Sequence, residues 1–485
     1  MNKPLRRIAM FCGILVLALL VRTNYLQYVR ADELNANEHN RRVEIERYAH
    51  ERGDIIVDGE PVTGSVETTG SDFRYKRVWK DGPLWAPVTG FSSQAFGSSQ
   101  LENLEDGILS GNGDQLFFDR TLSMFTGERQ TGGNIVTTLD GAAQRAAFEG
   151  LGDKKGAVAA LDPRTGAVLA LASTPSYDPS DFAGNSMKDS EAWQKLLKDE
   201  DKPMLNRALR ETYPPGSTFK VVTASAALEN GLYSDIDAET ESPLPWRLPL
   251  STNLLQNEGS IPCENASLRE ALRWSCNTVF GKMSDDLGND KMIEQAEKFG
   301  FNEEVFTPVR ADAAVYPKDN RPQNAMAGIG QASNRATPLQ MAMVAAAIAN
   351  DGKLMRPYMV AQRQAPNLDV IYTHDKEQLS RPLSAENAQK VQRMMETVVE
   401  DGTGTNARID GVTVGGKTGT AQHGLNNSEK PYAWFISYAR TDSGSPVAVA
   451  VVVEDGKAVR DDISGGGLAA PIAKSVMKAV LDGKK

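Results

Sequence analysis

The sequence has little cysteine, little histidine and fewer basic than acidic residues. Its 485 residues include 3 Cys and 4 His, and none of them falls in a zinc-ligand spacing. The 53 Lys and Arg are outnumbered by 63 Asp and Glu, which gives a formal net charge of -10. Nucleic-acid binding needs clustered basic side chains, and the sequence contains no such run. These shortages argue against a metal cluster and against a nucleic-acid partner.

Long apolar runs are also scarce, and the clearest one, residues 8–21, follows a basic N-terminus. The run reaches the roughly 20 residues that a bilayer requires if it continues through residues 22–29, with its tyrosines at the far interface. The sequence therefore predicts a cytoplasmic tail over residues 1–7 and a single transmembrane signal anchor over residues 8–29, with the remaining chain outside the cell membrane. A cleaved signal peptide and a buried core helix are the alternatives.

The exported part divides into two predicted units. Residues 30–140 are polar and rich in Gly, Ser and Thr, with short strand-like alternations, which favours a small extended pedestal or dimerisation-type domain. Residues 150–485 begin with a hairpin pattern around the turn at 162–166 and end with three apolar strand patterns and a helix. Mostly helical sequence separates these groups. We expect an α/β fold, in which distant segments form one sheet covered by helices on both faces, with a large helical insertion.

The segment Tyr213–Val221, YPPGSTFKV, contains a candidate nucleophile and base. Its prolines and glycine interrupt the preceding structure, and the Ala- and Val-rich run after them predicts a buried helix that begins at Ser217. The helix dipole favours a developing negative charge there. Lys220 lies on the same helix face, and an amine in apolar surroundings has a lowered pKa and can accept a proton. A serine cap followed by a lysine also occurs by chance.

Ser275 and Asn277 form a second, weaker signal on either side of Cys276. The hydroxyl could relay a proton, and the amide could hold a lysine and a substrate carbonyl by hydrogen bonds. An ordinary helix cap or turn explains the same pattern. Alone, these residues do not identify a site.

A third segment, GGKTGTA at residues 415–421, follows a strand pattern. Lys417, Thr418 and Thr420 could bind a carboxylate, and Gly419 would let a ligand approach the strand edge closely. A surface turn is the alternative. The three segments carry more weight together than separately.

In type and order, Ser217-x-x-Lys220, Ser275-x-Asn277 and Lys417-Thr418-Gly419 resemble the motif set of penicillin-binding proteins and serine β-lactamases. Arg52-Gly53-Asp54-Ile55, shortly after the predicted anchor, resembles the N-terminal signature of the class B, or monofunctional, penicillin-binding proteins. The overall layout is similar to the short actinobacterial type of that class. Further segments that resemble this class lie at residues 162–166, 175–179, 206–208, 328–331 and 337–340.

The resemblance implies a serine D,D-transpeptidase with a penicillin-binding, serine β-lactamase-like fold and no metal or organic cofactor. Ser217 would attack the D-Ala-D-Ala end of a peptidoglycan stem peptide and form an acyl-enzyme, and β-lactams would acylate the same hydroxyl. Lys220 would be the base, and Ser275 and Asn277 would complete the proton relay. A membrane glycosyltransferase, within the division or the elongation machinery, would be the partner.

By the same resemblance, Lys417, Thr418 and Thr420 would recognise the terminal carboxylate beside Gly419. The backbone N–H groups of Ser217 and Thr420 would form the oxyanion hole. A β-lactamase is disfavoured by the anchor, the pedestal and the long gap before the third motif. A D,D-carboxypeptidase, and a non-catalytic β-lactam sensor or scaffold, remain as alternatives.

Cys263 and Cys276 are a candidate disulfide in an exported protein, with two buried free thiols as the alternative. The bridge would pin the second motif. A loop of this length could contribute on the order of 3 kcal/mol.

Overall fold

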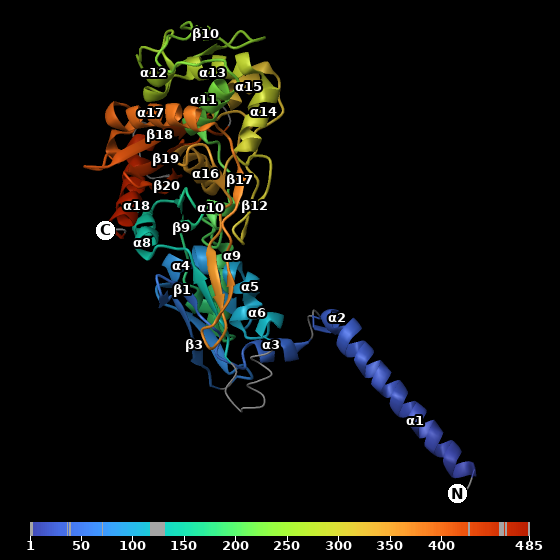
Figure 1. Ribbon diagram of the computed structural model, residues 1–485. Coiled ribbons are helices and arrows are strands. Elements are labelled where there is room, and N and C mark those ends of the chain that lie inside the picture. The colour runs from blue at the N-terminus through green and yellow to red at the C-terminus, as the bar shows by residue number, and fades with distance from the viewer. Residues whose placement is uncertain are drawn as a thin grey trace.

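The computed structural model describes residues 3–35, 37, 40–69, 71–116, 131–424, 427–454, 460 and 463–483. Figure 1 shows an isolated N-terminal helix, a narrow lower domain and a larger upper domain that carries the C-terminus. The residues outside this description belong to the predicted tail (1–2), the predicted pedestal (36, 38–39, 70 and 117–130) and the predicted C-terminal unit (425–426, 455–459, 461–462 and 484–485).

The N-terminal helix is α1 (Lys3–Asn24), which continues into η1 (Tyr25–Val29). The whole stretch has a mean hydropathy of 2.0, is long and apolar enough to cross a membrane, and has none of its most apolar window buried against the protein. A core helix of a soluble domain would be covered on at least one side. The buried-helix alternative is therefore wrong, and the helix fits a single-pass anchor.

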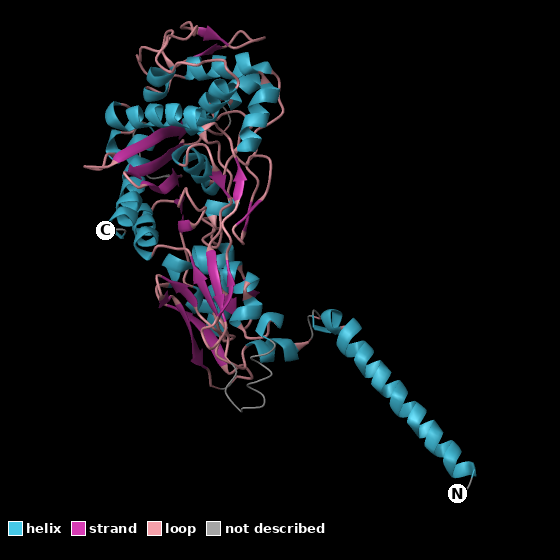
Figure 2. Cartoon of the chain, in the orientation of Figure 1, coloured by secondary structure: helices cyan, strands magenta, loops and turns pink. Residues whose placement is uncertain are grey.

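The lower domain contains a five-stranded sheet in the order β16-β15-β7-β1-β2. β15 and β16 form a hairpin that belongs, in sequence, to the predicted 150–485 unit, and β15 pairs antiparallel with β7. The hairpin is drawn in orange in the lower half of Figure 1, and Figure 2 shows this sheet apart from the upper one. The chain thus returns to the pedestal at residues 360–373. The strands are β1 (Ile55–Val57), β2 (Glu60–Pro61), β7 (Asn134–Thr137), β15 (Val360–Gln364) and β16 (Val370–Thr373).

A second hairpin and three short helices complete the pedestal around a buried charge cluster. The elements are β3 (Thr63–Glu67), β4 (Tyr75–Trp79), α4 (Gly82–Thr89), α5 (Gln100–Leu104) and α6 (Asp106–Leu109).

Glu102 is the centre of that cluster. Its carboxylate accepts hydrogen bonds from Arg52 Nε and from Arg77 Nε, both at 2.6 Å, and all three side chains are buried. Arg52 also donates to Asp106 Oδ1 at 2.6 Å. Buried ions carry a desolvation cost of several kcal/mol each, which is offset only while their partners remain in place. The cluster therefore fixes how the start of the exported chain meets α5 and α6.

The upper domain is built on an antiparallel sheet in the order β18-β19-β20-β8-β9. Residues 447, 449 and 451 of β20 pack into one core, and residues 448, 450 and 452 pack into another. Because strand side chains alternate between faces, this nearly continuous apolar strand is buried on both sides. The strands are β8 (Gly156–Leu161), β9 (Val168–Thr174), β18 (Thr413–Ala421), β19 (Tyr432–Thr441) and β20 (Gly444–Val453).

Helices cover both faces of this sheet. α8 (Gly141–Leu151) and α18 (Ala470–Gly483) pack on one face, and α16 (Pro338–Ala349) packs on the other. α16 begins as expected, because the Thr337 hydroxyl accepts a hydrogen bond from Gln340 N at 3.1 Å and Pro338 occupies the first helical position. The predicted two-layered covering of the sheet is confirmed.

Several helices between β9 and β18 form the predicted helical insertion at the top of Figure 1, whereas α16 and the β15–β16 hairpin from the same stretch pack on the upper sheet and in the pedestal. The insertion carries the first two motifs, whereas the third lies on β18. The predicted α/β architecture is therefore confirmed. The helices of the insertion that bear on the site are α11 (Lys220–Glu229), α12 (Leu268–Arg273), α13 (Asn277–Leu287) and α17 (Ala385–Asp401).

We expect Glu102→Ala to destabilise the protein by about 3–5 kcal/mol, because it leaves two buried guanidinium groups without their shared counter-charge. Thermal unfolding of the detergent-solubilised full chain, followed by tryptophan fluorescence, measures the loss. Glu60→Ala, at an exposed position on β2, is the matched control. Equal unfolding midpoints for the two variants would contradict the assigned role of Glu102.

Candidate active site

Ser217 lies within the insertion, in a short 3-10 turn that precedes α11. The turn η4 spans Gly216–Phe219, and α11 starts only at Lys220. The sequence predicted one continuous helix from Ser217, so its first turn is tighter than expected. Thr218 Oγ1 donates to Pro215 O at 2.7 Å, which ties the turn to the residue that precedes it. Ser217 itself is partly exposed.

Lys220 is fully buried, and its amine joins the first motif to the second. Nζ donates to Asn277 Oδ1 at 2.7 Å, to Ser275 O at 2.8 Å and to Ser275 Oγ at 3.1 Å. Burial lowers the pKa of Lys220 well below its usual value, and the nearby charge of Lys417 lowers it further. A neutral amine keeps two donors and gains a lone pair, so this group can act as a base at moderate pH.

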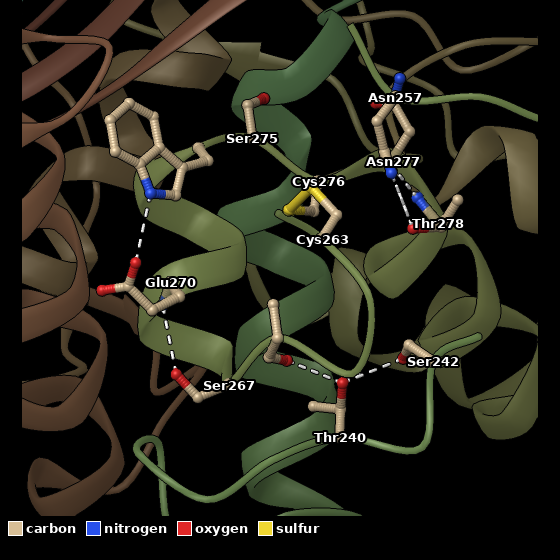
Figure 3. Close-up of a disulfide and its surroundings, with 12 residues drawn as sticks. Thr240, Ser242, Asn257, Cys263, Ser267, Glu270, Ser275, Cys276, Asn277 and Thr278 are labelled. Carbon is tan, nitrogen blue, oxygen red and sulfur yellow. Dashed lines mark hydrogen bonds between the residues drawn. A yellow bond between two sulfur atoms is a disulfide. The ribbon is translucent and has the colours of Figure 1, made fainter. Parts of the chain in front are cut away.

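The second motif is held in a turn between α12 and α13. Ser275 has a φ of 62°, a left-handed conformation that costs a non-glycine residue about 1–3 kcal/mol. Cys276 N donates to Ala271 O at 2.8 Å, and Cys276 is joined to Cys263 by a disulfide. Figure 3 shows this bridge directly beside Ser275 and Asn277. The anticipated pairing of the two cysteines is present, and it lies at the second motif.

The third motif lies on β18, the edge strand of the upper sheet. The Lys417 side chain is fully buried, and its Nζ donates to Thr418 O at 2.9 Å. Burial lowers the pKa of Lys417 to about 7. Since β18 pairs only with β19 within its sheet, its other edge can offer backbone groups to a ligand. Lys417, Thr418 and Thr420 thus lie along a strand that an extended peptide could approach.

Glycines allow the first and third motifs to approach closely. A Cβ atom on Gly419 would lie 3.1 Å from the Thr218 methyl group and 3.2 Å from Pro215 O. Gly216, with a φ of 54°, faces Ala421 at the end of β18, where a Cβ atom would meet the Ala421 Cβ at 3.0 Å. The chain on either side of Ser217 therefore packs directly against the strand that follows Lys417.

A further glycine, Gly330, packs against the turn that carries Ser217. Gly330 has a φ of 77°, and a Cβ atom there would lie 1.9 Å from Gly216 O. Gly216 N in turn donates to Gly330 O at 2.9 Å. This contact fixes the backbone immediately before Ser217.

Two residues near the motifs were not predicted from the sequence. Thr403 follows α17, and its hydroxyl forms a 2.6 Å hydrogen bond with Thr418 Oγ1. The flanking Gly402 and Gly404 mark a tight turn, but they do not indicate its partner. Glu258, exposed on a loop, is an acidic side chain whose charge raises the pKa values of both active-site lysines against the larger effect of burial. No local sequence pattern points to it.

All the predicted site residues thus lie in one region that combines a serine, two buried lysines and a strand edge that pairs with no other described strand. Within the described residues, no group of three or more His, Cys, Asp and Glu side chains is placed to hold a metal ion. The arrangement suits covalent catalysis by the serine hydroxyl, with a neutral lysine as base and a cationic group for an anionic substrate.

Comparison with family models gives two matches. Residues 156–478 match the penicillin binding protein transpeptidase domain, and residues 52–135 match the penicillin binding protein A dimerisation domain. The two matches cover the upper domain and most of the chain that forms the pedestal.

Full-length relatives and solved structures agree with these matches. The chain is 40% identical over 493 residues to the peptidoglycan D,D-transpeptidase PbpA of Mycolicibacterium smegmatis, covering 99% of each chain. It is 40% identical over 499 residues to PbpA of Mycobacterium tuberculosis, covering 100% of each. A crystal structure of PBPA from Mycobacterium tuberculosis covers 90% of this chain and 100% of that chain, at 40% identity and a TM-score of 0.84. Its ceftriaxone acyl-enzyme complex, at 39% identity and the same coverage, has a TM-score of 0.86.

We expect Gly330→Ala to lower the unfolding midpoint far more than Gly231→Ala does. Both positions have a positive φ, but a Cβ atom at Gly231 meets nothing within 4 Å, whereas at Gly330 it collides with backbone. The control therefore measures backbone strain alone, on the order of 1 kcal/mol. Thermal unfolding of both variants makes the comparison, and similar midpoints would show that the Gly216 contact is dispensable.

Proposed function

This chain belongs to the penicillin-binding protein transpeptidase family, and from that premise we propose that it is a peptidoglycan D,D-transpeptidase with Ser217 as its nucleophile. The observation that carries the assignment is the buried amine of Lys220, which lies three residues after Ser217 and is hydrogen-bonded to Ser275 and Asn277. A structural relative has been solved as acyl-enzyme complexes with ceftriaxone, imipenem and penicillin G, which supports a covalent mechanism and acylation by β-lactams here.

Acylation follows from the chemistry of the buried amine. Neutral Lys220 accepts the Ser217 hydroxyl proton, and Oγ bonds to the carbonyl carbon of the penultimate D-Ala. The amide C–N bond then breaks, and the terminal D-Ala leaves with a proton that Ser275 passes from Lys220. The 3.1 Å hydrogen bond between Lys220 Nζ and Ser275 Oγ supports this relay. Asn277 holds the amine in position.

The third motif binds the substrate. Cationic Lys417, with the hydroxyls of Thr418 and Thr420, recognises the terminal carboxylate of the stem peptide. The backbone N–H groups of Ser217 and Thr420 stabilise the oxyanion, which the close packing of η4 against β18 supports. In the second half-reaction, an amine of a neighbouring stem peptide attacks the acyl carbon and releases Ser217.

Two features of the chain support a position of this chemistry outside the cell. Basic residues at positions 3, 6 and 7 favour a cytoplasmic N-terminus for the anchor, and the disulfide suits an oxidising, exported environment. The donor and acceptor stem peptides then belong to the peptidoglycan outside the cell membrane. The partner is a membrane glycosyltransferase that supplies new strands during septation or elongation.

A fluorescent penicillin tests the nucleophile. We expect one covalent label per chain in the full-length protein and none in Ser217→Ala, because only this hydroxyl can form the stable acyl-enzyme. Intact-protein mass spectrometry counts the label. Ser234→Ala, at an exposed position beyond α11, should label like the parent protein. Persistent labelling of Ser217→Ala would overturn the assignment.

We expect the rate constant of penicillin acylation to follow a bell-shaped pH profile. The rising limb reflects deprotonation of Lys220, and the falling limb reflects loss of charge on Lys417, whose pKa is about 7 in the free site. Stopped-flow acylation kinetics at several pH values, with substrate well below saturation, measures both limbs.

Lys417→Arg is the matched variant for the falling limb, because a guanidinium stays charged throughout this range. We expect it to remove the fall above about pH 7, even if its altered geometry lowers the overall rate. A falling limb that survives in Lys417→Arg would show that another group controls carboxylate binding.

A further inference from the structure

The loop between β11 (Leu254–Leu255) and Cys263 is anchored to the second motif at its first residues. Asn277 Nδ2 donates to Gln256 O at 2.9 Å. Asn257 is bound twice to the next residue of α13, since its Oδ1 accepts from Thr278 N at 3.0 Å and its Nδ2 donates to Thr278 Oγ1 at 3.1 Å. Figure 3 shows the Asn257 side chain meeting Thr278 beside Asn277.

The other end of the loop is fixed to the same motif by a covalent bond. Cys263 forms the disulfide with Cys276, which immediately precedes Asn277. Both ends of the loop are therefore held by consecutive residues, Cys276, Asn277 and Thr278. Only residues 258–262 lie between these anchors, so Glu258 has little freedom to leave the neighbourhood of the second motif.

Glu258 provides a carboxylate near the two lysines of the site, Lys220 and Lys417. Its side chain is exposed, and no described basic side chain lies within ion-pair distance of it. Its charge nevertheless acts on Lys220 and on Lys417, which lie on α11 and β18. Glu258 directly follows the residues that bind Asn277 and Thr278, and Asn277 binds Lys220, so the loop holds this carboxylate near the lysines without pairing it with either. The mechanism proposed above leaves this carboxylate without a role.

We propose that Glu258 binds the acceptor amine of the second half-reaction and stabilises the positive charge that develops on it. This inference rests on the proposed transpeptidase function. The acceptor amine is mostly an ammonium at neutral pH, and a carboxylate at the cleft raises its local concentration. The positive charge of Lys417 would otherwise repel a cation.

The chemical step also creates positive charge. The bound ammonium first releases one proton to solvent water, and the nitrogen of the neutral amine then bonds to the acyl carbon and becomes cationic in the tetrahedral intermediate. One N–H proton then passes through Lys220 to Ser217 Oγ, the ester C–O bond breaks, and the amide product leaves. Glu258 gains no proton in this sequence, since its contribution is electrostatic.

Water as the acceptor gains less from Glu258, because it arrives uncharged. Glu258 thus favours cross-linking over hydrolysis, which is the difference between a transpeptidase and a carboxypeptidase. A general base for water at the same place would have the opposite effect. The partition of the acyl-enzyme between an amine and water separates the two roles.

The experiment uses the detergent-solubilised full chain with an acyl-D-alanyl thioester donor and D-alaninamide as the acceptor. Chromatography measures the aminolysis and hydrolysis products, and a fluorescent penicillin measures acylation of Ser217 separately. In Glu258→Gln, we expect the aminolysis-to-hydrolysis ratio to fall by about tenfold, in line with the loss of one electrostatic contact. Hydrolysis and penicillin labelling should persist.

Three comparisons sharpen the result. Glu264→Gln, at an exposed position just beyond Cys263, should keep the parent ratio. Glu258→Asp should recover part of it. With hydroxylamine, which is uncharged at neutral pH, the defect of Glu258→Gln should be smaller than with D-alaninamide, because no ammonium has to be attracted.

The possible outcomes are distinct. An unchanged ratio in Glu258→Gln, or an equal loss of both products, would overturn the proposed role of Glu258. A selective loss of hydrolysis would identify Glu258 as a base for water and would also overturn it. Absence of penicillin labelling in the parent protein would instead refute the proposed function itself.

Discussion

The active centre depends on one buried amine. Lys220 Nζ is withdrawn from water and hydrogen-bonded to the backbone and side chain of Ser275 and to the side chain of Asn277. Burial of a lysine costs free energy that three well-placed acceptors partly offset, and the remainder appears as a lowered pKa. The same contacts therefore join two segments of the chain and prepare the amine to accept a proton. Neither effect can be removed without the other.

The surrounding fold keeps that amine aligned with the strand that would bind substrate. β18 is an edge strand, but its sheet is packed on both faces, so the strand cannot shift without disturbing two hydrophobic cores. Gly216 and Gly419 then bring the turn that carries Ser217 against this strand at distances that a side chain would prevent. The site therefore needs both a packed sheet that holds β18 in place and glycines that let the turn of Ser217 reach this strand.

Local sequence patterns were sufficient for the sheet, the capped helix α16 and the motif residues, because periodicity, capping chemistry and motif spacing are properties of short segments. They were insufficient wherever distant segments meet. The hairpin β15–β16 pairs with β7 across more than two hundred positions, and Thr403 and Glu258 approach the motifs only in the folded chain. The 3-10 turn at Ser217 was also missed, since the packing of Gly216 against Gly330 fixes its geometry. Hydrophobic periodicity carries no information on such contacts.

The free site has more basic than acidic side chains, and this excess favours a substrate that ends in a carboxylate. The charge of Lys417 disfavours the charged form of Lys220, and the anion in their vicinity, Glu258, is exposed and forms no ion pair with a described side chain. A carboxylate that enters beside Lys417 removes part of this repulsion and raises the pKa of that lysine, so binding and protonation reinforce each other. In the proposed mechanism that carboxylate contacts Lys417 and not Lys220, so Lys220 can stay neutral. A single acidic end group on the substrate thereby separates the roles of two lysines that burial alone would treat alike.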